Sequence, residues 1–307
     1  MRWEELPKRE LHCHVDGSVS IALLSKLAGR AVARDEVTVP EECGSLSEYL
    51  KCFVLANEHM QSPEEIQSIT CDVIRQAALD HIDYMEPRFS LMLSEREGLT
   101  KDMAVEAVLR GLAEGERLYG VRSQLILCGL RHLTPEENIR MLDTAEKYLG
   151  KGVCAVDLAG DETTHPNMEF KEYLEEIKRR GIPLVIHSGE TGNVENVRTA
   201  IEYGAVRIGH GIALIKDPDL MQEAARKHVG IEMCPRSNLQ TKAAESLKNY
   251  PLPAFVEAGI PVSIHTDNRT VTDTTLTAEL ELIYDFYRDE GLMETLIQNA
   301  VETSLDR

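Results

Sequence analysis

The sequence predicts an α/β protein built as a single (β/α)8 barrel of the TIM type over residues 1–307, with extra helices inserted after the first strand. Short apolar or β-branched runs alternate with longer segments of helical periodicity, which is typical of repeated βα units around a parallel sheet. Eight such runs occur, and eight βα units are the number that closes a barrel. No linker, low-complexity stretch or internal repeat divides the 307 residues, so we expect one domain.

The eight expected strands are spread over the whole chain. They cover residues 9–14, 82–89, 121–128, 153–158, 182–187, 206–210, 229–234 and 261–267. Between them, Ser62 and Thr134 are each followed by Pro and two Glu residues, the pattern of a capped helix start, and Asp217 precedes Pro218 in the same way. Parallel strands need such crossover helices, so the pattern favours a closed barrel over an open doubly wound sheet.

The first crossover is unusually long and runs from residue 16 to about residue 80. Ser45 and Glu48 have the spacing of a capping box. The helix that they would open has an apolar face formed by Leu46, Tyr49, Leu50 and Phe53. Extra helices in a βα connection lie at the end of the barrel where active sites form. The insertion is therefore either a lid over a site or a packing appendage.

Charge and cysteine content exclude several classes of partner. The 52 acidic and 33 basic residues give a formal charge of −19, whose field repels nucleic-acid backbones and anionic membranes. The amino terminus lacks the apolar run of a secretory signal, and no stretch of about 18 apolar residues marks a membrane span. Seven scattered cysteines, an odd number, fit a reduced chain. We expect a cytoplasmic protein with a small-molecule partner, no nucleic acid polymer and no membrane.

Histidine and aspartate residues gather at the ends of the expected strands. His12 and His14 close the first strand, His187 the fifth, His210 the sixth and Asp267 the eighth. Side chains two apart on a strand point the same way, so His12 and His14 present two imidazoles together. Taken alone, such a pair is as easily two satisfied polar groups as a metal clamp. His187 and Asp267 at the same end of the barrel favour a divalent metal such as zinc, for which these two residues would complete a ligand set with His12 and His14.

Two short glycine-containing motifs at these strand ends carry further candidate catalytic residues, Glu190 and His210. Glu190 follows His187 after a Ser and a Gly that permits a sharp turn, so Glu190 is either a general acid/base or an ordinary acidic residue at a loop. His210 stands between two glycines, which either leave room for a ligand or make a turn. The sequence holds no His-Glu-x-x-His helix, phosphate-binding loop, dinucleotide fingerprint or Gly-x-Ser-x-Gly elbow, and no zinc signature of the cytidine deaminase type.

Six motifs, in order and at barrel spacing, carry a family resemblance. They are LPKRELHCHVDGS at 6–18, DLAGDE at 157–162, HSGE at 187–190, GHG at 209–211, CPRSN at 234–238 and HTDN at 265–268. On these motifs the chain resembles the adenosine deaminase family of metal-dependent amidohydrolases, nearly end to end. The resemblance implies hydrolysis of adenosine, and of deoxyadenosine, with release of ammonia. The alternatives are deamination of adenine or a modified adenine nucleoside, and a non-catalytic barrel, although such a barrel would be expected to lose some of these residues.

The resemblance also implies one Zn²⁺ per chain, held by His12, His14, His187 and Asp267, and a role for each further residue. Glu190, His210 and Asp267 would be catalytic: Glu190 protonates ring nitrogen 1, His210 stabilises the nucleophile, and Asp267 takes the proton of a zinc-activated water. Asp16 would meet the ribose hydroxyl and the Gly160 backbone the purine ring. The complete set of implied substrate contacts is His14, Asp16, Gly160 and Asn268.

Three positions depart from the family pattern. Asn268 stands where a second Asp is common, and its amide already carries the donor that ring nitrogen 7 needs. The segment 53–61 is less apolar than the family pattern and lacks the proline that this pattern usually has. We expect this difference to affect substrate selection more than any other property. His265 replaces a commoner Asn and shares a strand face with Asp267; we expect it to be a core histidine, with a supporting role at the site as the alternative.

Overall fold

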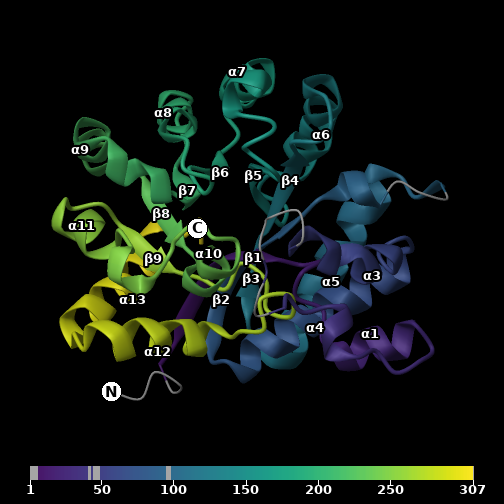
Figure 1. Cartoon of the computed structure of the whole chain (residues 1–307). Coiled ribbons are helices and arrows are strands. Elements are labelled where there is room, and N and C mark those ends of the chain that lie inside the picture. The colour runs from purple at the N-terminus through teal and green to yellow at the C-terminus, as the bar shows by residue number, and fades with distance from the viewer. Residues whose placement is uncertain (1–5, 41–42, 44–48, 95–97, 307) are drawn as a thin grey trace.

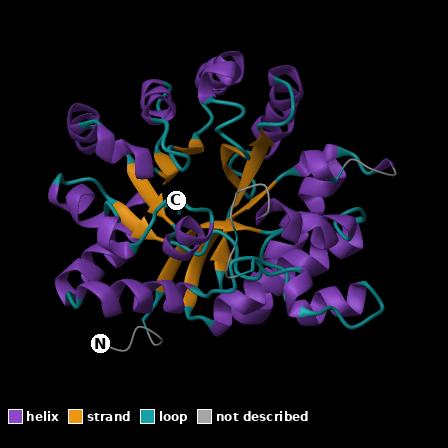
Figure 2. Ribbon diagram, viewed as in Figure 1, coloured by secondary structure: helices purple, strands orange, loops and turns teal. Residues whose placement is uncertain are grey.

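The computed structural model describes residues 6–40, 43, 49–94 and 98–306, in which a ring of helices surrounds a central set of strands (Figure 1, Figure 2). The barrel strands are β1 (Lys8–His14), β2 (Ile82–Phe89), β4 (Leu125–Leu130), β5 (Val153–Ala159), β6 (Val185–Ser188), β7 (Arg207–His210), β8 (Gly230–Met233) and β9 (Val262–Ile264). All eight expected strands are present. The third is divided, because the short β3 (Arg122–Ser123) pairs with β2 before β4 begins, and the last is shorter than expected.

The strands form two parallel runs, β1-β2-β4-β5 and β6-β7-β8-β9. Two parallel bridges join the runs: Val156 with Leu184 between β5 and β6, and Cys13 with Asp267 between β1 and the residues after β9. At the second junction the backbone N–H of His14 donates to the Asp267 carbonyl at 2.8 Å, and that of Asp267 donates to the His12 carbonyl at 2.9 Å. The barrel therefore closes as predicted, and its closing seam carries three of the expected metal ligands.

Helices follow the strands and cover the outside of the barrel (Figure 1). They are α4 (Pro63–Leu79), α5 (Lys101–Tyr119), α6 (Pro135–Tyr148), α7 (Lys171–Arg180), α8 (Val194–Glu202), α9 (Pro218–Arg226), α11 (Leu252–Glu257), α12 (Leu276–Tyr287) and α13 (Glu290–Thr303). The short α10 (Pro235–Gln240) instead lies over the carboxyl ends of the strands (Figure 1), where its residues contact Asp267 and His210. The predicted caps are confirmed, since the side chains of Ser62, Thr134 and Asp217 accept backbone N–H groups at the starts of α4, α6 and α9. None of the helices in the described ranges is long and apolar enough to cross a membrane.

The long connection after β1 contains α1 (Ile21–Leu27), a 3-10 turn at Arg34–Glu36, another at Leu50–Phe53, and α3 (Val54–Glu58) before α4 begins. Three residues of the predicted capping-box helix, Ser45, Leu46 and Glu48, lie outside the described residues. Tyr49 and Phe53 are buried, but Leu50 is 43 % exposed. The expectation that Leu50 shares their buried face is therefore wrong, because Leu50 lies at the rim of a cavity rather than in the core.

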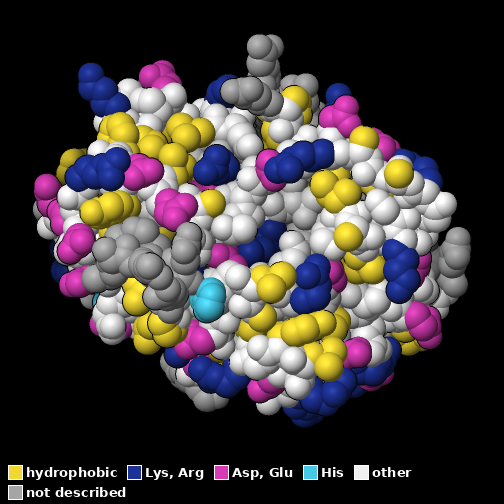
Figure 3. All heavy atoms as spheres, turned by 90° about the horizontal axis from the view of Figure 1, so that it is seen from below, with side chains coloured by type: hydrophobic (Ala, Val, Ile, Leu, Met, Phe, Trp, Pro, Cys, Tyr) yellow, Lys and Arg dark blue, Asp and Glu magenta, His cyan; other side chains and the backbone are white. Residues whose placement is uncertain are grey.

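On the face in Figure 3, Lys and Arg side chains alternate with Asp, Glu and apolar side chains. The formal charge of −19 is thus not offset on this face by a continuous basic patch of the kind that binds a nucleic-acid backbone.

Candidate metal centre and catalytic pocket

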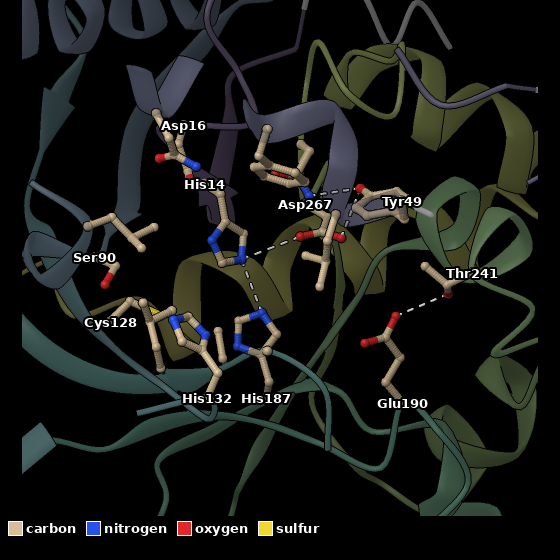
Figure 4. A pocket seen from close by; sticks show the side chains of 18 of the residues that line it. His14, Asp16, Tyr49, Ser90, Cys128, His132, His187, Glu190, Thr241 and Asp267 are labelled. Atoms are coloured by element: carbon tan, nitrogen blue, oxygen red, sulfur yellow. Dashed lines mark hydrogen bonds and ion pairs between the residues drawn. The ribbon is translucent and has the colours of Figure 1, made fainter. Parts of the chain in front are cut away.

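A cavity of about 270 Å³ opens at the carboxyl ends of the strands. The ends of β1, β4, β5, β6 and β7 supply its floor, and the insertion after β1 supplies one wall through Tyr49, Leu50, Phe53 and Asn57. The insertion is therefore part of the pocket wall. Figure 4 shows His14, His187 and Asp267 pointing toward one another, with Glu190 and Thr241 on the opposite side of the pocket.

The four expected metal ligands converge on one point. His12 Nε2 lies 3.2 Å from His187 Nε2, and His14 Nε2 lies 3.1 Å from that same nitrogen. Asp267 Oδ1 is 3.5 Å from both His12 Nε2 and His14 Nε2. Ligand atoms bound to Zn²⁺ at about 2.1 Å lie roughly 3.0 Å apart at a right angle and about 3.4 Å apart at a tetrahedral angle. The separations in this protein therefore suit a single small divalent ion.

Two buried carboxylates set the protonation of these histidines. Glu232 Oε2 lies 2.9 Å from His12 Nδ1, and Asp157 Oδ2 lies 2.9 Å from His187 Nδ1. Each carboxylate holds a proton on Nδ1, so each Nε2 turns an unprotonated lone pair toward the shared point. Burial and the nearby Arg88 charge lower the pKa of His12 to about 4. Neutral imidazoles with facing lone pairs repel one another unless a cation lies between them, so the residues fit a metal.

Arg88 binds both of these carboxylates at once. Its Nη1 donates to Asp157 Oδ2 at 2.8 Å, and its Nη2 donates to Glu232 Oε2 at 2.7 Å. Burial acts to raise the pKa of Glu232, but the charges of Arg88 and Arg207 outweigh it and hold that pKa well below its ordinary value. Both carboxylates therefore stay ionised as partners of the histidines. Sequence reasoning missed Arg88 and Glu232, although charged residues inside apolar strands were a signal that could have found them.

Asp267 lies on the barrel seam in an uncommon backbone conformation. Its φ is +60°, in the left-handed region, which costs about 1–3 kcal/mol for a residue other than glycine. Ser237 Oγ donates to Asp267 Oδ2 at 2.6 Å, and Tyr49 OH lies 3.5 Å from the same oxygen. Burial acts to raise the pKa of Asp267, but the hydrogen bond and charge of His12 outweigh it and hold that pKa well below the ordinary value. Asp267 is thus an ionised acceptor with its second oxygen fixed by Ser237, a contact that the sequence did not reveal.

Glu190 is buried at the side of the cavity away from β1. Thr241 Oγ1 donates to Glu190 Oε1 at 3.0 Å, and His210 Nε2 lies 3.7 Å from Oε2. Burial raises the pKa of Glu190, which favours its protonated form. The preceding Gly189 has φ +78°, and a Cβ there would lie 2.5 Å from a Val197 methyl, so the turn requires glycine as predicted. Thr241 had no sequence signal.

His210 has φ +64° and a fixed ring. The Asn238 side-chain amide donates to His210 Nδ1 at 2.9 Å, which leaves Nε2 as the protonated nitrogen facing Glu190. The glycines beside His210 do not make room for a ligand: a Cβ at Gly209 would lie 2.7 Å from the His12 ring, and one at Gly211 would lie 2.9 Å from Ile231. They serve close packing and the turn instead. One atom each of His12, His187, His210 and Asp267 lies within 4.8 Å of the others, so His210 adjoins the metal position.

The expected substrate contacts lie around the rest of the cavity, which is lined by His14, Asp16, Gly160 and Asn268. Burial raises the pKa of Asp16 to about 6. Gly160 lines the pocket and has φ +109°, in the left-handed region that favours glycine. Asn268 donates to Tyr49 OH at 2.8 Å, and its Oδ1 is buried without a hydrogen-bond partner.

His265 lies beneath the site as a core histidine, as expected. It is fully buried, with Nδ1 at 3.0 Å from Glu10 Oε1 and Nε2 at 2.8 Å from Ser263 Oγ. Both ring nitrogens are occupied by these neighbours, and His265 does not line the cavity.

Comparison with known proteins gives similar relatives over almost the entire chain. The family model described as adenosine deaminase matches residues 7–306. An adenosine deaminase from Enterococcus faecalis is 40% identical over 312 residues, which cover 98% of this chain and 92% of that protein. The solved N6-methyl-AMP deaminase from Arabidopsis thaliana is 25% identical with a TM-score of 0.85, covering 99% of this chain and 93% of its own. An adenine deaminase from Arthrobacter aurescens shares the fold at 22% identity, with a TM-score of 0.87 over 98% and 94% of the two chains.

Proposed function

The chain belongs to the adenosine deaminase family, and we propose that it hydrolyses adenosine, and deoxyadenosine with it, to the inosine nucleoside and ammonia. The observation that carries this proposal is the convergence of metal-binding atoms from His12, His14, His187 and Asp267 beside the buried Glu190 in one cavity. A hydrolytic deaminase needs a nucleophile and a proton donor on one substrate, and this arrangement provides both within the same pocket.

We propose Zn²⁺ as the metal, one per chain, because three imidazole nitrogens and one carboxylate oxygen are donors that it prefers. His12, His14, His187 and Asp267 would hold it. When bound, Zn²⁺ would lower the pKa of water to roughly 7 and so supply a nucleophile at neutral pH. Asp157 and Glu232 keep the ligand nitrogens of His187 and His12 free of protons for that purpose.

The protein's own side chains move the protons. Asp267, ionised in the folded protein, accepts a proton from the attacking water, while His210 donates its Nε2–H to the water oxygen and stabilises the charge there. Glu190, protonated because burial raises its pKa, donates to ring nitrogen 1 and makes carbon 6 electrophilic. As the bond from carbon 6 to oxygen forms, a hydroxyl is placed on carbon 6. The amino nitrogen then takes up the proton held by Asp267 and leaves as ammonia, and the hydroxyl on carbon 6 returns a proton to Glu190 as the carbonyl forms.

The pocket favours an uncharged nucleoside. None of the described residues that line the cavity is Lys or Arg, the side chains that bind phosphate groups. We assign Asp16 to the ribose hydroxyl and the Gly160 backbone to the purine ring, with His14 beside the substrate. Asn268, held by Tyr49, directs an amide N–H to ring nitrogen 7. A free base such as adenine has no ribose hydroxyl for Asp16 to bind.

We further propose that residues 1–307 act as one catalytic domain, with the connection 16–80 closing over the pocket. The seven cysteines are an odd number and show no repeating short spacing, which supports a reducing, cytoplasmic compartment.

A direct assay tests the function. Purified protein loaded with Zn²⁺ is given adenosine, and the loss of absorbance near the adenine band and the release of ammonia are followed. Adenine and N6-methyl-AMP are assayed beside it. We expect adenosine to give the highest kcat/KM, and Asp16→Ala to lower kcat/KM for adenosine far more than for adenine. Absence of adenosine turnover, or a higher kcat/KM for adenine, would refute the assignment.

A further inference from the structure

We propose that Glu162 is a positioning residue for Glu190. Its carboxylate binds the backbone N–H groups of the residues on both sides of Glu190. This inference rests on the proposed function, in which Glu190 is the proton donor. Glu162 belongs to the motif at 157–162 and lies in the loop after β5, far in sequence from the turn that it binds.

The Glu162 carboxylate is buried and accepts three hydrogen bonds. Glu162 is 3 % exposed. Its Oε2 accepts the backbone N–H of Gly189 at 2.8 Å, and its Oε1 accepts the backbone N–H of Thr191 at 2.6 Å. The side-chain amide of Asn196 donates to Oε2 at 2.8 Å. The two backbone donors belong to the residues immediately before and after Glu190, so the carboxylate spans it.

A second set of buried side chains supports the residues before the turn. Asn167 donates to Ser188 Oγ at 2.8 Å, and Arg131 Nη2 donates to the His187 carbonyl at 2.7 Å. Asn167 also accepts from Arg131 and donates to the Asn196 carbonyl. Side chains from other parts of the fold therefore hold segment 187–191 in place.

Glu190 depends on this external support. Gly189 has no side chain to fix the turn, and among the described residues the Glu190 carboxyl is held by a hydrogen bond from Thr241 at 3.0 Å. Hydrogen bonds from N–H groups to an ionised carboxylate are stronger than neutral ones. Misplacing a catalytic group by about 1 Å can cost on the order of 100-fold in rate. Loss of the Glu162 charge should therefore act on the chemical step through Glu190.

The test is Glu162→Gln, which keeps the shape but places an NH₂ group against one of the N–H donors. We expect kcat for adenosine to fall about 10- to 100-fold, with KM and zinc content near the parent values. Asp161→Asn is the matched control. It makes the same change in the same loop, but Asp161 bonds only within that loop, to Thr163 N at 2.9 Å and Thr164 Oγ1 at 2.7 Å. Its kcat should stay at the parent level.

A second measurement separates positioning from a merely structural role. Glu162→Gln should weaken binding of a nucleoside whose base carries a tetrahedral, hydroxyl-bearing carbon at position 6 by the same factor as kcat, and leave inosine binding unchanged. If Glu162→Gln does not fold, Glu162→Asp, which shortens the side chain and keeps its charge, should show the same pattern. An unchanged kcat, or a parallel loss of kcat, zinc and inosine binding, would overturn the inference. Failure of the parent enzyme to deaminate adenosine would instead overturn the proposed function.

Discussion

Replacing Glu190 with Gln removes the proton that the mechanism needs and little else. In the parent protein the Thr241 hydroxyl donates to Glu190 Oε1 at 3.0 Å, and the amide oxygen of Gln can accept the same hydrogen bond. The amide nitrogen takes the place of Glu190 Oε2, which lies 3.7 Å from His210 Nε2. The fold and the metal ligands should therefore be unaffected. The Glu190 side chain is 10 % exposed, so water is poorly placed to act as a substitute donor.

General acid catalysis contributes about 10²- to 10⁴-fold to rate, which corresponds to roughly 3–5 kcal/mol of transition-state stabilisation. Because Glu190 is buried and unsupported by a second acid, we expect Glu190→Gln to lose about 10³-fold in kcat, with zinc content and melting temperature near those of the parent. Steady-state deamination of adenosine and elemental analysis measure these quantities. Glu195→Gln is the control, an exposed carboxyl nearby at the start of α8. If Glu190→Gln kept kcat within about 5-fold of the parent, the reasoning that makes Glu190 the proton donor would be wrong.

Three further changes test other parts of the site and the fold. Thr241→Val removes the hydrogen bond to Glu190 and should lower kcat about 2- to 10-fold, whereas Thr241→Ser should stay near the parent; equal rates for both variants in steady-state assays would contradict a role for the hydroxyl. Asp157→Asn loses the ionised partner of His187 and should weaken zinc affinity about 10- to 100-fold in a chelator competition, and unchanged affinity would show that the carboxylate does not tune the ligand. Glu279→Gln tests pH dependence, because burial raises the pKa of Glu279 from 4.5 to about 7. The folded protein therefore holds this proton more tightly than the unfolded chain does. The resulting contribution to the free energy of unfolding is fully present below pH 4.5 and is lost as pH rises through 7, by up to about 3 kcal/mol. Since Gln cannot ionise, the melting temperature of Glu279→Gln relative to the parent should rise between pH 5 and 8, and a flat difference would refute the shift.

The barrel interior ties the metal position to charges deep in the fold. Arg207 Nε donates to Glu232 Oε1 at 2.5 Å, and its Nη1 donates to the Thr303 carbonyl at 2.8 Å. Glu232 therefore joins His12 at the site to Arg207 and, through it, to the end of α13 at the other side of the barrel. Removing one partner from such a network leaves a buried charge without compensation and costs about 3–5 kcal/mol. We therefore regard these residues as unsuitable for tests of catalysis alone.

The sequence by itself determined the fold class and predicted which side chains gather at the proposed metal position. A period of two in the first strand places His12 and His14 on one side, and parallel strands bring His187 and Asp267 to the same rim, whatever the details of packing. The boundaries were less accurate: the third strand is split and the last is shorter, because pairing with neighbours decides where a strand ends and the sequence of that strand does not encode its neighbours.

Only the tertiary structure decided how the site is supported. Arg88 meets Glu232, a residue 144 positions away, and Glu162 meets Gly189, 27 positions away. The structure also decided the role of the glycines beside His210. They do not leave room for a ligand, because His12 and Ile231 occupy the space beside them. Local patterns report what a residue can do within its own strand or turn, whereas a buried charge is satisfied by whichever segment the closed barrel brings against it, and that depends on all eight strands at once.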